Sequence, residues 1–228
     1  MVSKKKAAEM IDVMEELFPD AHCELNFKNE FELVLAVLLS AQTTDKSVNK
    51  LTATLFEKYK TPQDYLNVTL EELEQDIKTI GLYRSKAKNI QALCRLLLEE
   101  YNGVVPNTFE ELVKLPGVGR KTANVVLSVG FNVPRIAVDT HVDRISKRLG
   151  LAKADDTVLD VEHKLMRLIK EERWSKSHHL MIFFGRYHCT AKNPKCETCP
   201  LFTSCKEGKR LIKKAKQKDF SFEESFFY

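Results

Sequence analysis

Long apolar runs are absent from this chain of 228 residues. Its longest strongly apolar stretches, around Phe31–Ser40 and Leu180–Phe184, are far too short to span a bilayer. Glu9 and Asp12 follow the amino-terminal lysines, where a secretory signal would have an apolar segment. Low-complexity segments and long linkers are also lacking. With 43% hydrophobic and 30% charged residues, the composition is that of a globular protein, and we expect a cytoplasmic one.

Net charge is also small, at +4, but it is unevenly distributed. Residues 186–218 carry ten basic and two acidic side chains, whereas residues 219–228 carry only acidic charges, three in all. A basic segment on a nearly neutral body indicates a polyanionic partner, nucleic acid first, or simply a solvated basic tail. The last nine residues contain five aromatic side chains, which fit a segment that packs on the body, one that binds a partner, or a mobile tail.

The hydrophobic periodicity is helical nearly throughout, and strand patterns are almost missing. Apolar stripes predict helices over 48–59, 90–101 and 158–169. The segment Thr43–Asp45 is available as a cap for the first of these, and Thr69–Glu72 and Thr108–Glu111 have the spacing of capping boxes. Only Arg135–Val138 resembles a strand, and it has no partner strand. The predicted fold class is therefore all-α.

Four of the six cysteines lie close together in the sequence, with the spacing C-x6-C-x2-C-x5-C: Cys189, Cys196, Cys199 and Cys205. In a reducing compartment, four thiolates within so short a segment indicate one metal centre rather than two disulfides. The spacing alone leaves two kinds of centre open, an iron–sulfur cluster and a zinc site. The isolated Cys94 falls on an apolar helical stripe, which predicts a small buried side chain.

The segment Leu115–Ala123 carries two glycines in a tight turn between two helical patterns, the first ending at Pro116. Such a hairpin directs the backbone N–H groups of Gly117, Gly119 and the start of the second helix outward, where they can bind a phosphate. A plain turn between helices explains the glycines but leaves the adjacent Arg120 and Lys121 unexplained. We therefore predict phosphate binding here.

Downstream, Asp139 stands between an apolar segment and a helical pattern. This position predicts an N-cap, and it is equally compatible with a carboxylate directed at a functional site.

Together these features resemble the helix–hairpin–helix family of DNA base-excision glycosylases, and within it the endonuclease III branch that carries an iron–sulfur cluster. The resemblance extends from about residue 10 to 210. Besides the hairpin and the cysteine spacing, the matching stretches are Leu38–Asp45, Ile80–Tyr83 and Ala137–Val142.

The resemblance implies an architecture of two helical domains with a DNA-binding cleft between them. One is a helical barrel over residues 23–133 with the helix–hairpin–helix motif. The other joins residues 1–22 to 134–211 and carries the cluster loop, and a tail follows over 212–228. It also implies a 4Fe–4S cluster rather than zinc, held by Cys189, Cys196, Cys199 and Cys205. Lys192 and Lys195, in the loop between the first two ligands, would then contact DNA phosphates.

The resemblance further implies that Lys121 is the nucleophile and Asp139 the essential carboxylate. Gln42 and Leu82 match positions that fill or wedge the DNA stack where a base is flipped out. A lysine amine is protonated at neutral pH, so Lys121 needs activation, which we expect from partial burial, the helix N-terminus and Arg120.

The function implied is a bifunctional DNA glycosylase and AP lyase of base excision repair, acting on oxidised pyrimidines in double-stranded DNA. We expect a monomer associated with a bacterial nucleoid. Two alternatives stay open: an adenine mismatch glycosylase, which normally lacks the lysine and has a large extra domain, and a non-catalytic DNA-binding module held together by zinc.

Overall fold

The computed structural model describes residues 2–205, 207, 208 and 210. These residues form helices and loops without any β-strand, so the predicted all-α class is confirmed, and Arg135–Val138 is a plain connecting segment. No helix in this part of the chain is long and apolar enough to cross a membrane. The aromatic tail and the basic residues from 211 to 218 lie outside the described residues.

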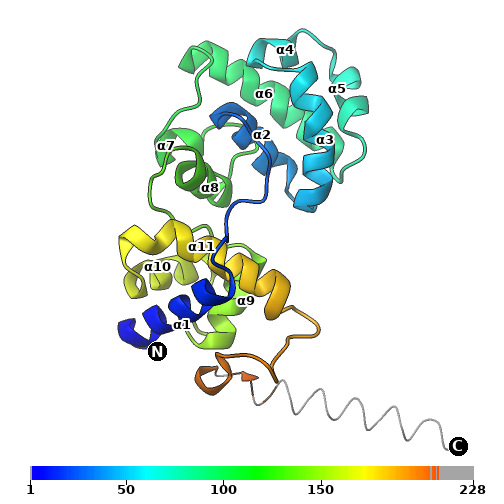
Figure 1. The fold of residues 1–228 in the computed structure, drawn as a ribbon. Helices are drawn as coiled ribbons and strands as arrows, with labels where there is room; N and C mark the ends of the chain where they lie inside the picture. Colours follow the sequence, from blue (N-terminus) through cyan, green and yellow to red (C-terminus); the bar gives the residue numbers. More distant parts are fainter. Residues whose placement is uncertain (1, 206, 209, 211–228) are drawn as a thin grey trace, which may run out of the picture. The chain divides into compact units, whose positions relative to one another are not determined.

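The chain divides into two compact units, shown in Figure 1. One unit is Cys23–Arg135, here called the hairpin unit. The other, here called the cysteine unit, combines the described residues of Met1–His22 with those of Ile136–Tyr228. The domain boundaries and the DNA-binding cleft inferred from the sequence stay predictions.

The hairpin unit is built around one buried helix. Its helices are α2 (Glu30–Leu39), α3 (Asp45–Lys58), α4 (Pro62–Leu66), α5 (Leu70–Ile77), α6 (Tyr83–Tyr101), α7 (Phe109–Leu112) and α8 (Arg120–Gly130). Every residue of α2 from Phe31 to Leu39 is buried, and the helix packs against α3, α6 and α8. This position explains why the segment is apolar except for Glu32, whose carboxylate accepts a hydrogen bond from the N–H of Lys28.

Capping residues fix where these helices begin. The hydroxyl of Thr44 accepts a hydrogen bond from the N–H of Ser47, and Thr69 with Glu72 forms the predicted capping box of α5. Of the second predicted capping box, Thr108 and Glu111, only the hydrogen bond from the N–H of Glu111 to the hydroxyl of Thr108 forms. The carboxylate of Glu111 accepts the hydroxyl proton of Thr108 at 2.6 Å, so it does not bind the backbone N–H of that residue. Cys94 is fully buried, as predicted.

The cysteine unit packs an amino-terminal helix against later segments of the chain. Its helices are α1 (Lys4–Leu17), α9 (Thr140–Leu149), α10 (Val158–Leu168), the 3-10 turn η1 (Glu171–Arg173), α11 (Trp174–Phe183), the π-helical turn η2 (Phe184–His188) and the 3-10 turn η3 (Phe202–Ser204). Their buried residues form a single apolar cluster.

Ion pairs connect α1 to the segment that follows α10. The guanidinium of Arg173 lies 2.6 Å from a carboxylate oxygen of Asp12 and 2.9 Å from one of Glu15. Burial of Met10, Ile11 and Met14 adds an apolar contribution on the same helix. The amino-terminal helix therefore belongs to the cysteine unit although more than 110 residues separate it from α9 in the sequence.

Candidate functional site

The predicted hairpin lies between α7 and α8. The first helix ends at Leu112 and not at the predicted Pro116, because Lys114 and Leu115 continue the chain through single turns. Gly117 has φ +79°, a conformation that side chains rarely adopt. A Cβ atom there would lie 2.8 Å from Leu38 Cδ1 and 3.0 Å from Asn89 Cβ. This glycine is therefore required both for the turn and for close packing on α2 and α6.

The N-terminus of α8 is open. Gly119 is its N-cap residue, no side chain caps the helix, and a Cβ added at Gly119 would meet nothing within 4 Å. The guanidinium of the next residue, Arg120, lies over the ring of Phe109 at 5.0 Å. The N-cap residue thus offers no side-chain acceptor to the first turn of α8, and helix N-termini of this kind favour an anion such as phosphate.

Lys121 is the second residue of α8, and its side chain is exposed. Within the described part of the chain its Nζ makes no hydrogen bond and no ion pair. The partial burial expected from the sequence is therefore not found, because this position of α8 faces away from the apolar side of the helix. The other two activating features, the helix N-terminus and the neighbouring Arg120, are in place.

Gln42 and Leu82 occupy two neighbouring loops, and both have left-handed backbone conformations. Their φ angles are 54° and 60°, which are uncommon for residues other than glycine. Leu82 leaves 54% of its surface exposed, although its side chain is large and apolar. The loops meet at Gly81, where an added Cβ would lie 3.8 Å from the carbonyl oxygen of Gln42. Backbone strain at two exposed, adjacent positions is typical of a functional surface.

A buried lysine holds these two loops together. Lys86 is only 4% exposed, and its Nζ donates to the carbonyl oxygens of Leu39 (2.8 Å) and Ala41 (2.7 Å) and to the hydroxyl of Thr43 (3.0 Å). Its ammonium group therefore has a partner for each of its three donors and lies at the carboxyl end of α2, where the helix dipole favours a cation.

Lys86 sits one turn after Leu82, and its acceptors Ala41 and Thr43 flank Gln42 on both sides. Burial lowers its pKa below the usual range. Sequence reasoning missed this residue, because nothing in the pattern distinguishes it from the exposed Lys88 two positions later.

Replacing Lys86 with methionine should therefore destabilise the hairpin unit. The change keeps an unbranched side chain, shorter by the one terminal atom, but leaves the carbonyl oxygens of Leu39 and Ala41 without their donor. We expect a loss of about 2 to 3 kcal/mol in the free energy of unfolding, measured by urea denaturation. Lys88→Met on the same helix is the matched control and should cost less than about 0.5 kcal/mol. Equal losses in the two variants would contradict this role.

Asp139 is the N-cap residue of α9, as predicted. One carboxylate oxygen, Oδ1, accepts hydrogen bonds from the backbone N–H groups of His141 (2.9 Å) and Val142 (2.8 Å). The side chain is half-buried, and its other oxygen has no hydrogen bond from any described residue. The cap thus fixes the carboxylate in position while one oxygen stays available for chemistry.

A small polar network surrounds this cap. The ring nitrogen Nδ1 of His141 lies 3.2 Å from the guanidinium of Arg144, which also donates to the carbonyl oxygen of Gly185 at 2.8 Å. Burial is the main cause that lowers the pKa of His141. A neutral ring with Nδ1 as acceptor fits this arrangement. His141 thus supports Asp139 through its backbone N–H, which donates to Oδ1.

The four cysteines lie in the loop that follows η2, and they are near enough to influence one another. Burial, with a smaller contribution from the thiols of Cys189, Cys205 and Cys196, raises the pKa of Cys199 to about 11. Cys189 is buried, and the side chains of Cys199 and Cys205 pack against the apolar core of the unit. The sequence-predicted donor set therefore gathers at one place on the cysteine unit.

Arg148, a second residue that sequence reasoning missed, connects this loop to α9. Its guanidinium donates to Cys189 Sγ at 3.3 Å and to the carbonyl oxygens of Thr190 (2.7 Å) and Ala191 (3.0 Å). The thiol of Cys205 in turn donates to the carbonyl oxygen of Arg148 at 3.5 Å. Such outer contacts orient metal ligands in many metalloproteins.

The chemistry of the donor set fits the predicted centre. The four thiols lie in one loop, and two of them pack against the apolar core of the cysteine unit. Cysteine thiolates are the usual ligands of iron–sulfur clusters and also hold structural zinc, so the donor set accommodates an iron–sulfur cluster.

Comparisons with known proteins decide the family. Residues 35–171 match the HhH-GPD superfamily of base excision DNA repair proteins. The chain belongs to this superfamily. Residues 189–205, from the first to the last clustered cysteine, match the iron–sulfur binding domain of endonuclease III.

Similar proteins cover almost the whole chain. Endonuclease III of Bacillus subtilis (strain 168) is 59% identical over 214 residues, covering 94% of this chain and 98% of its own length. Endonuclease III of Escherichia coli (strain K12) is 47% identical over 210 residues, covering 92% and 99%. A solved structure of a trapped endonuclease III–DNA covalent intermediate has 61% identity and a TM-score of 0.91, covering 93% of this chain and all of its own.

The HhH-GPD protein described here therefore carries a 4Fe–4S cluster, and the zinc alternative is excluded by the match to an iron–sulfur binding domain. The clustered cysteines are the only cysteines in the matched range, and they would hold the cluster. When bound, it supplies a rigid covalent tie across the loop from residue 189 to 205.

Replacing Cys196 with alanine should therefore damage folding of the loop, because metal binding and local folding are coupled. We expect iron content to fall from four atoms per chain toward zero, and limited proteolysis to cut near residues 190–204. Cys94→Ala is the control and should leave iron content unchanged. Full iron loading of the Cys196 variant would remove this residue from the ligand set.

The structure distributes the predicted site residues over both units. Gln42, Leu82 and the hairpin with Lys121 lie together in the hairpin unit, around the carboxyl end of α2. Asp139 and the cysteine loop, including the exposed Lys192 and Lys195, lie in the cysteine unit. The roles of these residues in binding and catalysis stay predictions.

Proposed function

We propose that the protein is a DNA N-glycosylase and DNA-(apurinic or apyrimidinic site) lyase that removes oxidised pyrimidines from double-stranded DNA. The observation that carries the proposal is Lys121, an exposed lysine at a helix N-terminus without a side-chain cap, whose Nζ has no partner among the described residues. A phosphate at this N-terminus would hold a nucleotide beside an amine that is free to react. A plain DNA-binding hairpin does not require such an amine.

In the first step, the neutral Nζ of Lys121 attacks the anomeric carbon of the damaged nucleotide. The bond between that carbon and the base breaks, and the base leaves with the bonding electrons and takes up a proton. Opening of the sugar ring then gives a protonated imine between the lysine and the sugar. Lysine imines with carbonyl carbons are established covalent intermediates.

In the second step, the imine acidifies the neighbouring C–H bond. Loss of that proton drives β-elimination, in which the C–O bond on the 3′ side breaks and the phosphate leaves with its electrons. Hydrolysis of the remaining imine returns the free amine of Lys121. The strand is thus cut 3′ to the abasic site without any oxidant or reductant.

Asp139 acts before and during this sequence. Breaking a glycosidic bond develops positive charge on the sugar, which a nearby carboxylate stabilises. The oxygen that is not used by the α9 cap is the one available for this purpose, and it can also accept the proton from the lysine. Lys121 belongs to the hairpin unit and Asp139 to the cysteine unit.

Gln42 and Leu82 act on the duplex rather than on the bond that breaks. A base inside a duplex cannot be reached until it is flipped out, and the gap must be filled. An exposed leucine suits the role of a wedge between base steps, and the amide of Gln42 can hydrogen-bond to base edges. Lys86 would position both loops for this task.

Lys192 and Lys195 contribute to affinity. Both are exposed in the cysteine loop, and neither side chain has an acidic partner in the described part of the chain. Such lysines neutralise DNA phosphates and release counterions. We further infer that the protein acts as a monomer on the bacterial nucleoid in the cytoplasm.

Replacing Lys195 with alanine should weaken binding to all duplexes equally, with or without a lesion. The slope of log K against log salt should become shallower by about 0.9, the value for one phosphate contact. Lys60→Ala, in an exposed loop of the hairpin unit, is the control and should leave the slope unchanged. A slope equal to that of the unmodified protein would place Lys195 off the DNA surface.

A panel of duplexes, each with one lesion, tests the substrate class. Release of oxidised pyrimidines, together with cleavage of abasic sites, supports the proposal. Release of adenine opposite a mismatched base, without strand cleavage, would replace it by a monofunctional activity. Binding without either reaction would leave only a DNA-binding module.

A further inference from the structure

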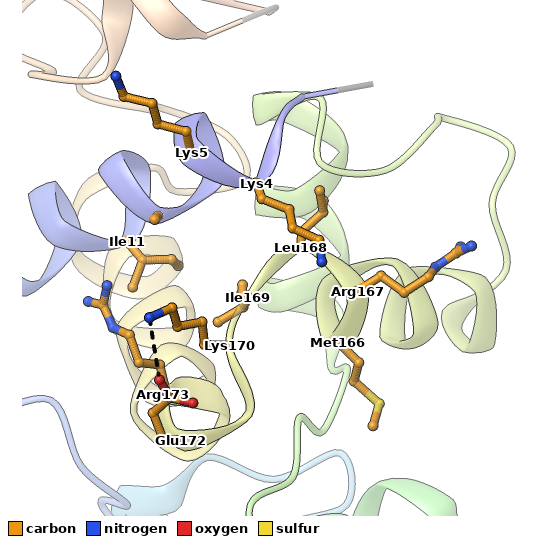
Figure 2. A pocket seen from close by; sticks show the side chains of 11 residues that line it. Lys4, Lys5, Ile11, Met166, Arg167, Leu168, Ile169, Lys170, Glu172 and Arg173 are labelled. Atoms are coloured by element: carbon orange, nitrogen blue, oxygen red, sulfur yellow. Dashed lines mark ion pairs between the residues drawn. The ribbon is translucent and has the colours of Figure 1, made fainter.

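A groove in the cysteine unit, lined by none of the candidate site residues, lies between α1 and the chain from α10 to η1 (Figure 2). Its volume is about 770 Å³, which is large enough for several side chains. The apolar lining comes from both of its walls: Ala8, Ile11, Met166, Leu168 and Ile169. Solvent-accessible apolar grooves of this kind are typical of binding surfaces.

The rim of this groove is strongly basic. Arg173 is already paired with Asp12 and Glu15, and Lys170 lies 3.8 Å from Glu172. By contrast, Lys4, Lys5 and Arg167 are exposed and have no carboxylate partner in the described part of the chain. Three unpaired cations beside an apolar surface indicate an occupant that is both acidic and apolar.

The dipole of α1 also favours an acidic occupant at this end of the groove. Lys4 and Lys5 occupy the first turn of α1, and that turn contains no acidic residue. Cations are unfavourable at a helix N-terminus, where the partial charge of the dipole is positive. An acidic segment bound at the groove would offset this repulsion.

The chain itself contains a segment with the required chemistry. Residues 219–228 hold three acidic side chains and no basic ones, and five of the ten residues are aromatic. The last described residue, Arg210, belongs to the same unit as the groove. The residues between it and the acidic segment can span up to about 30 Å when extended. A compact unit of about 100 residues has a radius of gyration of about 13 Å, so this span is comparable with the width of the unit.

We propose that this acidic, aromatic segment, residues 219–228, docks in the groove between α1 and η1 of its own chain. Aromatic rings would cover the partly exposed Ala8, Leu168 and Met166, and the thioether of Met166 makes favourable contacts with aromatic rings. Glu223 and Glu224 would lie at the basic rim. Because the segment is tethered, its effective concentration at the groove is in the millimolar range, which favours this occupant over free peptides.

Photo-crosslinking tests the proposal in the full chain with its cluster bound. Benzoylphenylalanine replaces Phe226, the protein is irradiated, and the adducts are mapped by peptide mass spectrometry. We expect adducts within residues 4–11 and 166–173 in species of monomer mass, with a yield that does not depend on protein concentration. Adducts at other surfaces, or only in species of dimer mass, would overturn docking within one chain.

Charge-reversal variants test whether ion pairs hold the segment in the groove. Glu223→Lys with Glu224→Lys should lower the crosslinking yield at the groove about tenfold, the effect of losing two or more ion pairs. Lys4→Glu with Arg167→Glu should have a similar effect, whereas Lys46→Glu with Lys50→Glu, in the hairpin unit, should have none. A yield that is insensitive to the groove and tail charges would contradict the proposal.

Discussion

Replacing Lys121 with alanine should abolish trapping of the protein on lesion DNA by borohydride. Borohydride reduces an imine to a stable amine, so only a protein that forms the imine becomes attached to DNA. Without Nζ there is no imine, and neither base release through this route nor β-elimination can proceed. Binding to lesion DNA should weaken by no more than about fivefold, because Arg120 and the open N-terminus of α8 remain.

The control for this result is Lys114→Ala, which removes another exposed lysine from the same hairpin. Trapping by this variant should match that of the unmodified protein. Trapping that survives in Lys121→Ala, at a yield comparable with the control, would assign the nucleophile to another amine. Loss of binding together with trapping would mean that Lys121 acts through affinity alone.

Replacing Asp139 with asparagine should lower the rate of base release by about 10²- to 10³-fold. Asparagine retains an oxygen that can accept from His141 and Val142, so the cap of α9 persists while the negative charge is lost. Cleavage of a preformed abasic site should suffer less, since no glycosidic bond remains to be broken. Affinity for lesion DNA should persist or increase, because one negative charge has been removed near the DNA.

Two further variants separate catalysis from capping. Asp139→Ala removes both the charge and the cap and should cost about 1 kcal/mol of stability in addition to activity. Asp160→Asn, at a capping residue of α10 in the same unit, should leave base release unchanged. Base release by Asp139→Asn at nearly the unmodified rate, measured at equal DNA occupancy, would reduce Asp139 to a cap.

Local features of the structure could be predicted because they depend on residues close together in the sequence. The cap at Thr44, the box formed by Thr69 and Glu72 and the cap at Asp139 all involve contacts within three residues. Burial of Cys94 follows from the apolar periodicity of α6 alone.

Contacts between distant segments could not be predicted in this way. Lys86 binds acceptors more than 40 residues earlier, and Arg148 binds a loop more than 40 residues later. The left-handed backbone of Gln42 and Leu82 is also invisible in the pattern, because both residues ordinarily prefer negative φ. These tertiary features fix the geometry of the candidate site, whereas the sequence pattern identifies only its chemical groups.

The position of the trapped bond within the protein shows directly whether Lys121 is the nucleophile. Lesion DNA is incubated with the unmodified protein in borohydride, the adduct is digested, and the modified peptide is sequenced by mass spectrometry. We expect the sugar remnant to be attached to Nζ of Lys121. Attachment to any other lysine or to the amino terminus would contradict it.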